Sequence, residues 1–120
     1  MKIALSKTFQ IEAAHRLPLL PKGHKCERMH GHSFKIEVCV EGECDPRLGW
    51  LMDYAEIGAA FQPLFDQLDH RCLNDVSGLD NPTSEMLAKW VWDRLEPSLP
   101  LLTAVTVAET CTARAEYRGG

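Results

Sequence analysis

Polar and apolar positions alternate along two stretches of the chain. Between residues 3 and 15 the odd positions carry the larger apolar side chains and the even positions carry small or polar ones. Residues 30–40 repeat the alternation in the even phase. A period of two over such lengths is typical of a β-strand with one buried face. The pattern predicts two strands joined by a loop of about residues 16–28, and loops this long in small domains are usually functional.

The next segment changes to the spacing of an amphipathic helix. Asp53 is expected to cap its first turn, with Glu56 completing a capping box. The apolar stripe that follows consists of Ile57, Phe61, Leu64, Phe65 and Leu68. Pro63 lies within this stripe. Because a proline inside a helix costs about 3 kcal/mol, we expect a kink or a break there.

A second helix and two short strands complete the pattern. The helix is expected to begin at a cap formed by Thr83 or Ser84 and to end at Pro97. Alternation returns at residues 101–109 and again at 113–118. Strand pairs on either side of two consecutive helices predict an α+β fold in the order β-β-α-α-β-β. We expect a four-stranded antiparallel sheet with both helices on one face.

Composition limits the class of protein. The length of 120 residues fits one domain spanning residues 1–120. No strictly apolar run exceeds three residues, whereas a membrane-spanning helix needs about 20, so no membrane association is expected. The five cysteines form no CxxC pair. This argues against a disulfide framework and favours a reducing, cytoplasmic location.

Charge is distributed unevenly along the chain, although the net charge is −4. Residues 1–35 hold seven basic and two acidic residues, and residues 36–120 hold six basic and fifteen acidic ones. The basic residues of the predicted loop are Arg16, Lys22, Lys25 and Arg28. They fit either a solvated loop or a local anion site. The acidic total argues against nucleic acid as a partner.

His30-Gly31-His32 carries the strongest chemical signal. Residues i and i+2 of a strand point to the same face, so both imidazoles can bind one metal ion. His15 lies in the apolar phase of the first strand, which predicts three inward-facing histidines on adjacent strands. A three-histidine site that leaves the fourth position open is typical of catalytic zinc. The alternative is a set of hydrogen-bonded core histidines.

Cys26 stands four residues before His30, at the end of the basic loop. A thiol near a metal and cations has a lowered pKa, and the thiolate is its reactive form. The alternative is an ordinary packed cysteine, which is the interpretation we favour for the other four. His24 is expected to be an ordinary loop residue.

Two further sites carry carboxylates. Asp69 could orient the imidazole of His70, but only if the helix has ended, because adjacent helical residues do not face each other; otherwise the pair is a charged helix end. Glu109 occupies the apolar phase of the third predicted strand. Its carboxylate needs either an internal partner, such as an arginine, or a ligand that offers two parallel N–H groups.

Taken in order, these motifs resemble a known family. They are EAAH at 12–15, CERMHGH at 26–32, GWLMD at 49–53, LDH at 68–70, NPTSE at 81–85 and ET at 109–110. The set resembles the 6-pyruvoyl-tetrahydropterin synthase family, in particular its bacterial 6-carboxy-5,6,7,8-tetrahydropterin synthase branch of queuosine biosynthesis. The resemblance covers about residues 8–118.

The resemblance implies a tunnelling fold and roles for individual residues. It implies one zinc ion per subunit on His15, His30 and His32. It implies that Cys26 transfers protons in a triad with Asp69 and His70, and that Glu109 anchors the pterin with help from the region of Thr83. It also implies a homo-oligomer, a hexamer built as a dimer of trimers, with active sites at subunit interfaces.

The expected function is therefore a zinc-dependent carbon–carbon lyase. It would convert 7,8-dihydroneopterin triphosphate to 6-carboxy-5,6,7,8-tetrahydropterin, releasing acetaldehyde and triphosphate. Apart from the resemblance, we expect Arg16, Lys22, Lys25 and Arg28 to attract the triphosphate. Two alternatives stay open. One is 6-pyruvoyl-tetrahydropterin synthesis, which keeps the three-carbon side chain, and the other is a non-catalytic zinc-binding module.

Overall fold

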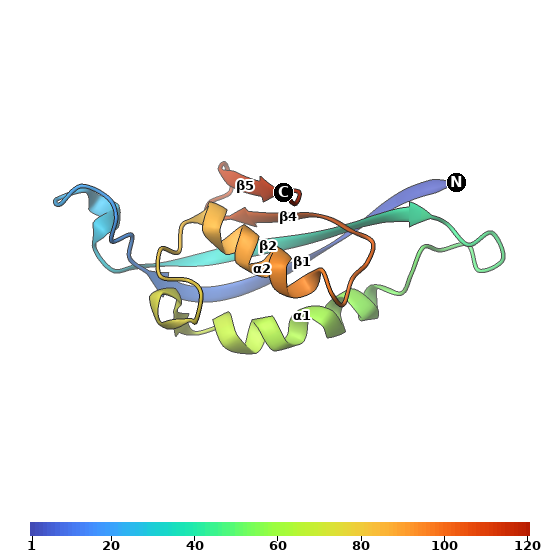
Figure 1. Cartoon of the computed structure of the whole chain (residues 1–120), viewed down its shortest axis with the longest axis horizontal. Helices are drawn as coiled ribbons and strands as arrows, with labels where there is room; N and C mark the ends of the chain where they lie inside the picture. The colour runs from blue at the N-terminus through green and yellow to red at the C-terminus, as the bar shows by residue number, and fades with distance from the viewer.

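A computed structural model describes all residues, 1–120. The main elements are β1 (Lys2–His15), β2 (His30–Glu43), α1 (Tyr54–Leu68), β3 (Arg71–Cys72), α2 (Ser84–Leu95), β4 (Leu102–Ala108) and β5 (Arg114–Tyr117) (Figure 1). Two short 3₁₀ helices, η1 (Lys25–Glu27) and η2 (Leu73–Asp75), interrupt the loops. The α+β class and the order of the main elements are confirmed. Neither α-helix is long and apolar enough to cross a membrane.

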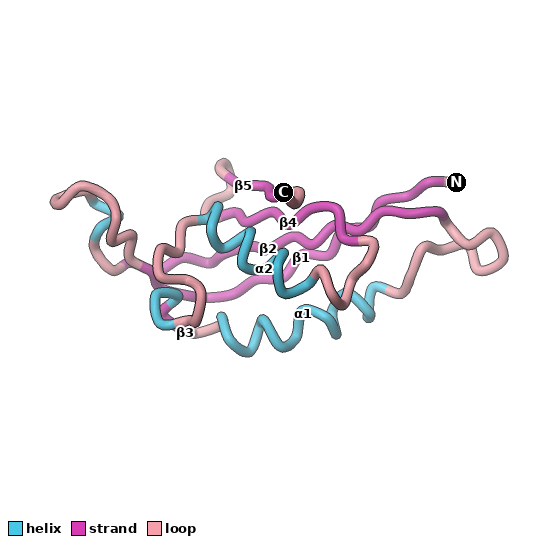
Figure 2. The backbone as a smooth tube through the Cα atoms, in the orientation of Figure 1, coloured by secondary structure: helices cyan, strands magenta, loops and turns pink.

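The strands form one sheet in the order β3-β1-β2-β4-β5 (Figure 2). The β1–β2, β2–β4 and β4–β5 pairs are antiparallel, as predicted. The sheet has five strands instead of the four predicted, because the short strand β3 pairs with β1 in parallel. Strand β3 has only two residues, which is too short for any alternation to show in the sequence.

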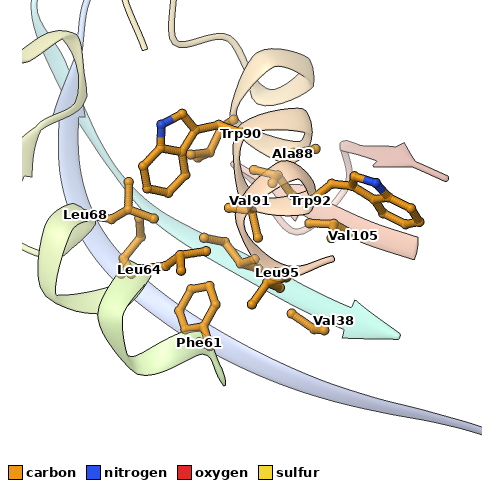
Figure 3. Close-up of a cluster of buried hydrophobic side chains, with 14 of the residues drawn as sticks. Val38, Phe61, Leu64, Leu68, Ala88, Trp90, Val91, Trp92, Leu95 and Val105 are labelled. Atoms are coloured by element: carbon orange, nitrogen blue, oxygen red, sulfur yellow. The ribbon is translucent and has the colours of Figure 1, made fainter. Parts of the chain in front are cut away.

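The core lies between the sheet and the two helices. The even positions of β2 from Phe34 to Val40 are fully buried, and the apolar stripe of α1 packs in the same cluster as α2. Figure 3 shows Phe61, Leu64 and Leu68 of α1 facing Val91 and Leu95 of α2. Both helices therefore cover one face of the sheet, as predicted.

Helix α1 runs through Pro63, so the expected break is wrong. The Pro63 side chain is exposed. Because proline has no N–H, the Ala59 carbonyl loses its helical hydrogen bond. Ala59 is also exposed, so this carbonyl lies on the solvent side of the helix. Water can satisfy it, which lowers the cost of the proline. Burial of the apolar stripe on the opposite side of α1 offsets the remainder.

The alternation expected at residues 101–109 shifts within β4. The β2–β4 register changes between Cys39 and Val40, and a β-bulge of this kind moves side chains to the other face. Leu102 is buried in place of Leu101, whereas Val105 and Val107 are buried as predicted.

Candidate functional site

Three histidines meet where β1 ends and β2 begins. In the β1–β2 register, His15 lies opposite His30 and Ala13 lies opposite His32. The ring centroid of His15 lies 4.5 Å from that of His30 and 5.2 Å from that of His32. The three potential ligand nitrogens all lie within 4.8 Å of one another. This cluster, His15, His30 and His32, could hold a metal ion.

Backbone carbonyls orient two of these rings. Nδ1 of His15 lies 2.7 Å from the Pro82 carbonyl oxygen, and Nδ1 of His30 lies 2.7 Å from that of Arg28. Because a carbonyl oxygen only accepts hydrogen bonds, both Nδ1 atoms are donors, and in the neutral form of each ring the lone pair is on Nε2. Metal-binding histidines are commonly held in this way through their other ring nitrogen.

His15 has the chemistry of a metal ligand. It is fully buried, and its Nε2 atom has no hydrogen-bond partner. Burial lowers the pKa of His15 below its usual value, although its hydrogen bond to the Pro82 carbonyl acts in the opposite direction. A neutral imidazole with an unsatisfied inward nitrogen is costly to bury without a partner. The residues present therefore fit a metal ion.

Glu109 lies beside the histidine cluster, immediately after β4. Its Oε2 atom is 3.7 Å from Nε2 of His32, and its Oε1 atom accepts a 2.6 Å hydrogen bond from the Ser84 hydroxyl. The side chain is 27% exposed. The internal partner is thus a serine and a histidine rather than an arginine. The carboxylate stays accessible from a shallow pocket that Ser84 and Arg114 also line.

Asp69 and His70 form a pair because α1 has ended. Asp69 caps the helix, and His70 has a positive φ of 57°. Asp69 Oδ1 accepts from the backbone N–H of Glu12 at 2.9 Å, and Oδ2 lies 2.8 Å from Nδ1 of His70. The Glu12 N–H and the His70 ring together lower the pKa of Asp69. The objection that neighbours on a helix cannot face each other therefore does not apply.

Cys26 lies in the loop between β1 and β2. It lies within η1, is half-buried, and forms no hydrogen bond or ion pair with Asp69, His70 or the histidine cluster. Its backbone N–H donates to Nδ1 of His24. The structure thus places the three histidines beside Glu109 and Asp69 beside His70, and within the chain no hydrogen bond or ion pair links these groups to Cys26.

The remaining predicted site residues lie at the edge of this region. Lys22, Lys25 and Arg28 are exposed, Arg16 is half-buried, and none of the four takes part in an ion pair. Thr83 is the N-cap of α2, and its hydroxyl accepts from the Met86 N–H at 3.1 Å. That hydroxyl accepts this bond at the helix cap and can still donate one of its own.

Sequence reasoning missed two polar residues that support the site. Ser84 binds Glu109, and Asn74 binds both backbone groups of Arg16, the residue after His15. The sequence indicates Ser84 only as a candidate helix cap. Since each contact joins residues more than 20 positions apart, no local spacing could have indicated it.

The fold and the site together define a candidate metalloenzyme, and comparisons with known proteins identify its family. Residues 4–120 match the family described as 6-pyruvoyl tetrahydropterin synthase. A Synechocystis protein named 6-carboxy-5,6,7,8-tetrahydropterin synthase is 43% identical over 117 residues, covering 92% of this chain and 89% of that protein. A Pyrococcus furiosus protein named dihydroneopterin monophosphate aldolase is 35% identical over 100 residues, covering 83% and 81%.

A solved structure supports the same assignment. The Caenorhabditis elegans 6-pyruvoyl tetrahydropterin synthase structure matches with a TM-score of 0.90 at 26% identity, covering 100% of this chain and 97% of that one. The chain belongs to the 6-pyruvoyl tetrahydropterin synthase family, as its motifs predict. It is an enzyme of the lyase class, from a family that acts on pterins.

Proposed function

We propose that this enzyme converts 7,8-dihydroneopterin triphosphate to 6-carboxy-5,6,7,8-tetrahydropterin in queuosine biosynthesis, releasing acetaldehyde and triphosphate. The observation that carries the proposal is the buried, unpartnered Nε2 of His15 in a histidine cluster that adjoins the Glu109 carboxylate. The 43% identity to a 6-carboxy-5,6,7,8-tetrahydropterin synthase supports the choice of reaction.

The metal is proposed to be zinc, one ion per subunit, held by His15, His30 and His32. Three neutral imidazoles suit zinc and leave its fourth position open. Zinc bound there would supply Lewis acidity toward oxygens of the substrate side chain. The carbonyls of Pro82 and Arg28 keep two of the imidazoles in the tautomer that this role requires.

Glu109 is proposed to bind the pterin ring. A pterin presents its 2-amino group and its N3–H side by side, so one carboxylate can accept from both. Ser84 holds one carboxylate oxygen at 2.6 Å. Since each carboxylate oxygen can accept more than one hydrogen bond, this contact orients Glu109 and still leaves it able to bind the ring.

Cys26, Asp69 and His70 are proposed to move protons between the ring and the side chain. Asp69 accepts from Nδ1 of His70 and leaves Nε2 of that imidazole free for proton transfer. The His70 side chain is 77% exposed and forms no hydrogen bond with Cys26 within the chain. We therefore propose a homo-oligomer, a dimer of trimers, in which Cys26 of one subunit meets Asp69 and His70 of another.

A mixing experiment tests the shared site. Cys26→Ala and His70→Ala are each expected to be inactive. Refolding them together in equal amounts should restore about one quarter of wild-type activity, since that fraction of interfaces receives an intact residue from each side. No recovery, despite mixed oligomers detected by native mass spectrometry, would contradict the shared site.

The basic residues are proposed to attract the triphosphate. Arg16, Lys22, Lys25 and Arg28 have no acidic partner in the chain, so their positive field is free to attract an anion. Replacing Lys22 and Lys25 by alanine should raise KM for the triphosphate substrate and reduce its dependence on salt. Lys89→Ala, which removes a lysine paired with Asp93 on α2, is the matched control.

Product analysis with 7,8-dihydroneopterin triphosphate tests the reaction itself. Acetaldehyde and 6-carboxy-5,6,7,8-tetrahydropterin are expected in equal amounts. A product that retains all three side-chain carbons would instead establish 6-pyruvoyl-tetrahydropterin synthesis, the function in the name of the C. elegans structure. Turnover of dihydroneopterin monophosphate in preference to the triphosphate would favour the activity named for the P. furiosus relative. Zinc binding without turnover of either substrate would indicate a non-catalytic module.

A further inference from the structure

The loop that carries Cys26 is attached to the sheet by a side chain. Asn74 Oδ1 accepts from the Arg16 N–H at 2.9 Å, and Asn74 Nδ2 donates to the Arg16 carbonyl at 2.8 Å. Strand β3 pairs with β1 at Ala13–Arg71 and Ala14–Cys72. The Arg16–Asn74 contact has the same sequence offset as these pairs. The Asn74 amide therefore continues the β1–β3 pairing in register, after both strands have ended.

Both backbone groups of Cys26 are also fixed. Its carbonyl accepts from the N–H of Leu17, the residue after Arg16, at 3.0 Å. Its own N–H donates to Nδ1 of His24 at 3.1 Å, so His24 caps η1 through its ring. Starting from Asn74, the hydrogen bonds thus reach Arg16, pass to Leu17 and Cys26, and end at His24.

These hydrogen bonds tie the Cys26 backbone to the end of β1 and to Asn74. None of residues 16–28 is buried, so the loop gains little from apolar packing. A segment with few buried contacts opens locally at low cost unless hydrogen bonds hold it. The Sγ atom of Cys26 has no hydrogen-bond partner of its own in the chain. The position of the thiol thus depends on how the Cys26 backbone is held.

We propose that His24 and Asn74 are positioning residues that hold the Cys26 thiol in place for catalysis. The role given to the thiol rests on the proposed function above. His24 acts as a hydrogen-bond acceptor for the Cys26 N–H, and Asn74 anchors the loop where it leaves β1. In this role the imidazole of His24 takes no part in proton transfer.

Replacing His24 distinguishes an acceptor from an acid or base. His24→Ala should lower kcat roughly fivefold, the effect expected for one N-cap hydrogen bond. His24→Asn should restore kcat to within about twofold, because asparagine is among the best capping residues. If His24→Asn is as impaired as His24→Ala, the ring itself is required and the proposal is overturned.

Hydrogen–deuterium exchange reports the position of the loop without relying on activity. The amides of Leu17 and Cys26 are the donors in the two contacts of the Cys26 backbone. Peptides that contain them should exchange about fivefold faster in His24→Ala, whereas peptides from α2 should be unchanged. Zinc content should remain that of the wild type. Wild-type exchange and wild-type kcat in His24→Ala would overturn the proposal.

Asn74 is tested by two variants and a matched control. Asn74→Leu removes both hydrogen bonds, and Asn74→Asp keeps the acceptor for Arg16 N–H but loses the donor. Both variants should increase hydrogen exchange at the Leu17 amide and lower kcat. Asn74→Asp is the smaller change and provides the test if Asn74→Leu fails to fold. Gln67→Ala is the matched control, because Gln67 is another side-chain amide that donates to a backbone carbonyl, here on the exposed face of α1. It should alter neither the exchange at Leu17 nor kcat. Unchanged exchange in Asn74→Asp would overturn the anchoring role.

Cys26→Ala separates this inference from the proposed function. Normal turnover by Cys26→Ala would overturn the catalytic role of the thiol, and with it the positioning role. Loss of turnover in Cys26→Ala, combined with wild-type kcat and exchange in His24→Ala and Asn74→Asp, would overturn the positioning role alone.

Discussion

Metal binding at the histidine cluster should strongly stabilise the fold. In the metal-free chain, the buried Nε2 of His15 has no partner, and an unsatisfied buried polar atom costs about 1–3 kcal/mol. Free zinc at about 1,000 times its Kd would add about 4 kcal/mol to the free energy of unfolding. For a domain of this size 1 kcal/mol changes Tm by roughly 3–5 °C. Zinc should therefore raise Tm by about 12–20 °C over the chelated protein.

His15→Phe should remove this response without unfolding the chain. Phenylalanine replaces one planar ring by another beside Phe34, whose ring centroid is 5.2 Å from that of His15. The change removes the unsatisfied nitrogen, but it also removes the hydrogen bond to Pro82. Since each effect amounts to about 1–3 kcal/mol with opposite sign, the chelated variant should be within about 2 kcal/mol of the chelated wild type.

Thermal unfolding followed by circular dichroism, with zinc and with a chelator, measures both quantities. His24→Phe makes the same chemical change outside the cluster and should retain the full zinc-induced rise in Tm. A zinc-induced rise of wild-type size in His15→Phe would refute the assignment of the metal to this cluster.

Three other outcomes follow from the same contacts. Ser84→Ala removes a 2.6 Å bond to the Glu109 carboxylate and should raise the Kd for neopterin, measured by fluorescence, about tenfold; an unchanged Kd would contradict the orienting role. Asp69→Asn removes the charge that orients the His70 ring and should lower kcat by about 100-fold or more in steady-state assays, with Asp66→Asn as a control. In the chelated protein, the lowered pKa of His15 means that the unfolded state binds more protons. The free energy of unfolding should therefore fall as pH decreases below about 6.5 and stay level above it; urea titrations should show this slope in the wild type and a smaller slope in His15→Phe.

The histidine cluster could be predicted from sequence because strand periodicity is strict. Once residues 3–15 and 30–40 are taken as paired strands, the phase that buries Ile11 and Phe34 also turns His15, His30 and His32 inward. The alternation holds because a shift of one residue would expose the whole apolar face. The observed register brings these residues together as expected.

Other features depend on contacts that no local pattern records. Helix α1 continues through Pro63 because its opposite side is buried. The β-bulge opposite Cys39 and Val40 shifts the phase of β4 at its beginning. Ser84 and His24 act through hydrogen bonds to Glu109 and to the Cys26 backbone. Such bonds depend on tertiary placement and loop conformation, and composition and periodicity describe neither.

The ends of secondary-structure elements explain why the site lies where it does. Inside a strand or helix the backbone carbonyls are already bonded, whereas those at the ends remain free to accept from side chains. The rings of His15 and His30 donate to two such carbonyls, those of Pro82 just before α2 and Arg28 just after η1. His70 is oriented differently: its backbone N–H donates to the Glu12 carbonyl within β1 from a left-handed conformation just after α1, and its ring contacts the Asp69 carboxylate. The rings of His15 and His30 are thus oriented by carbonyls outside the regular elements, at a place where β1, η1 and α1 end and β2 and α2 begin.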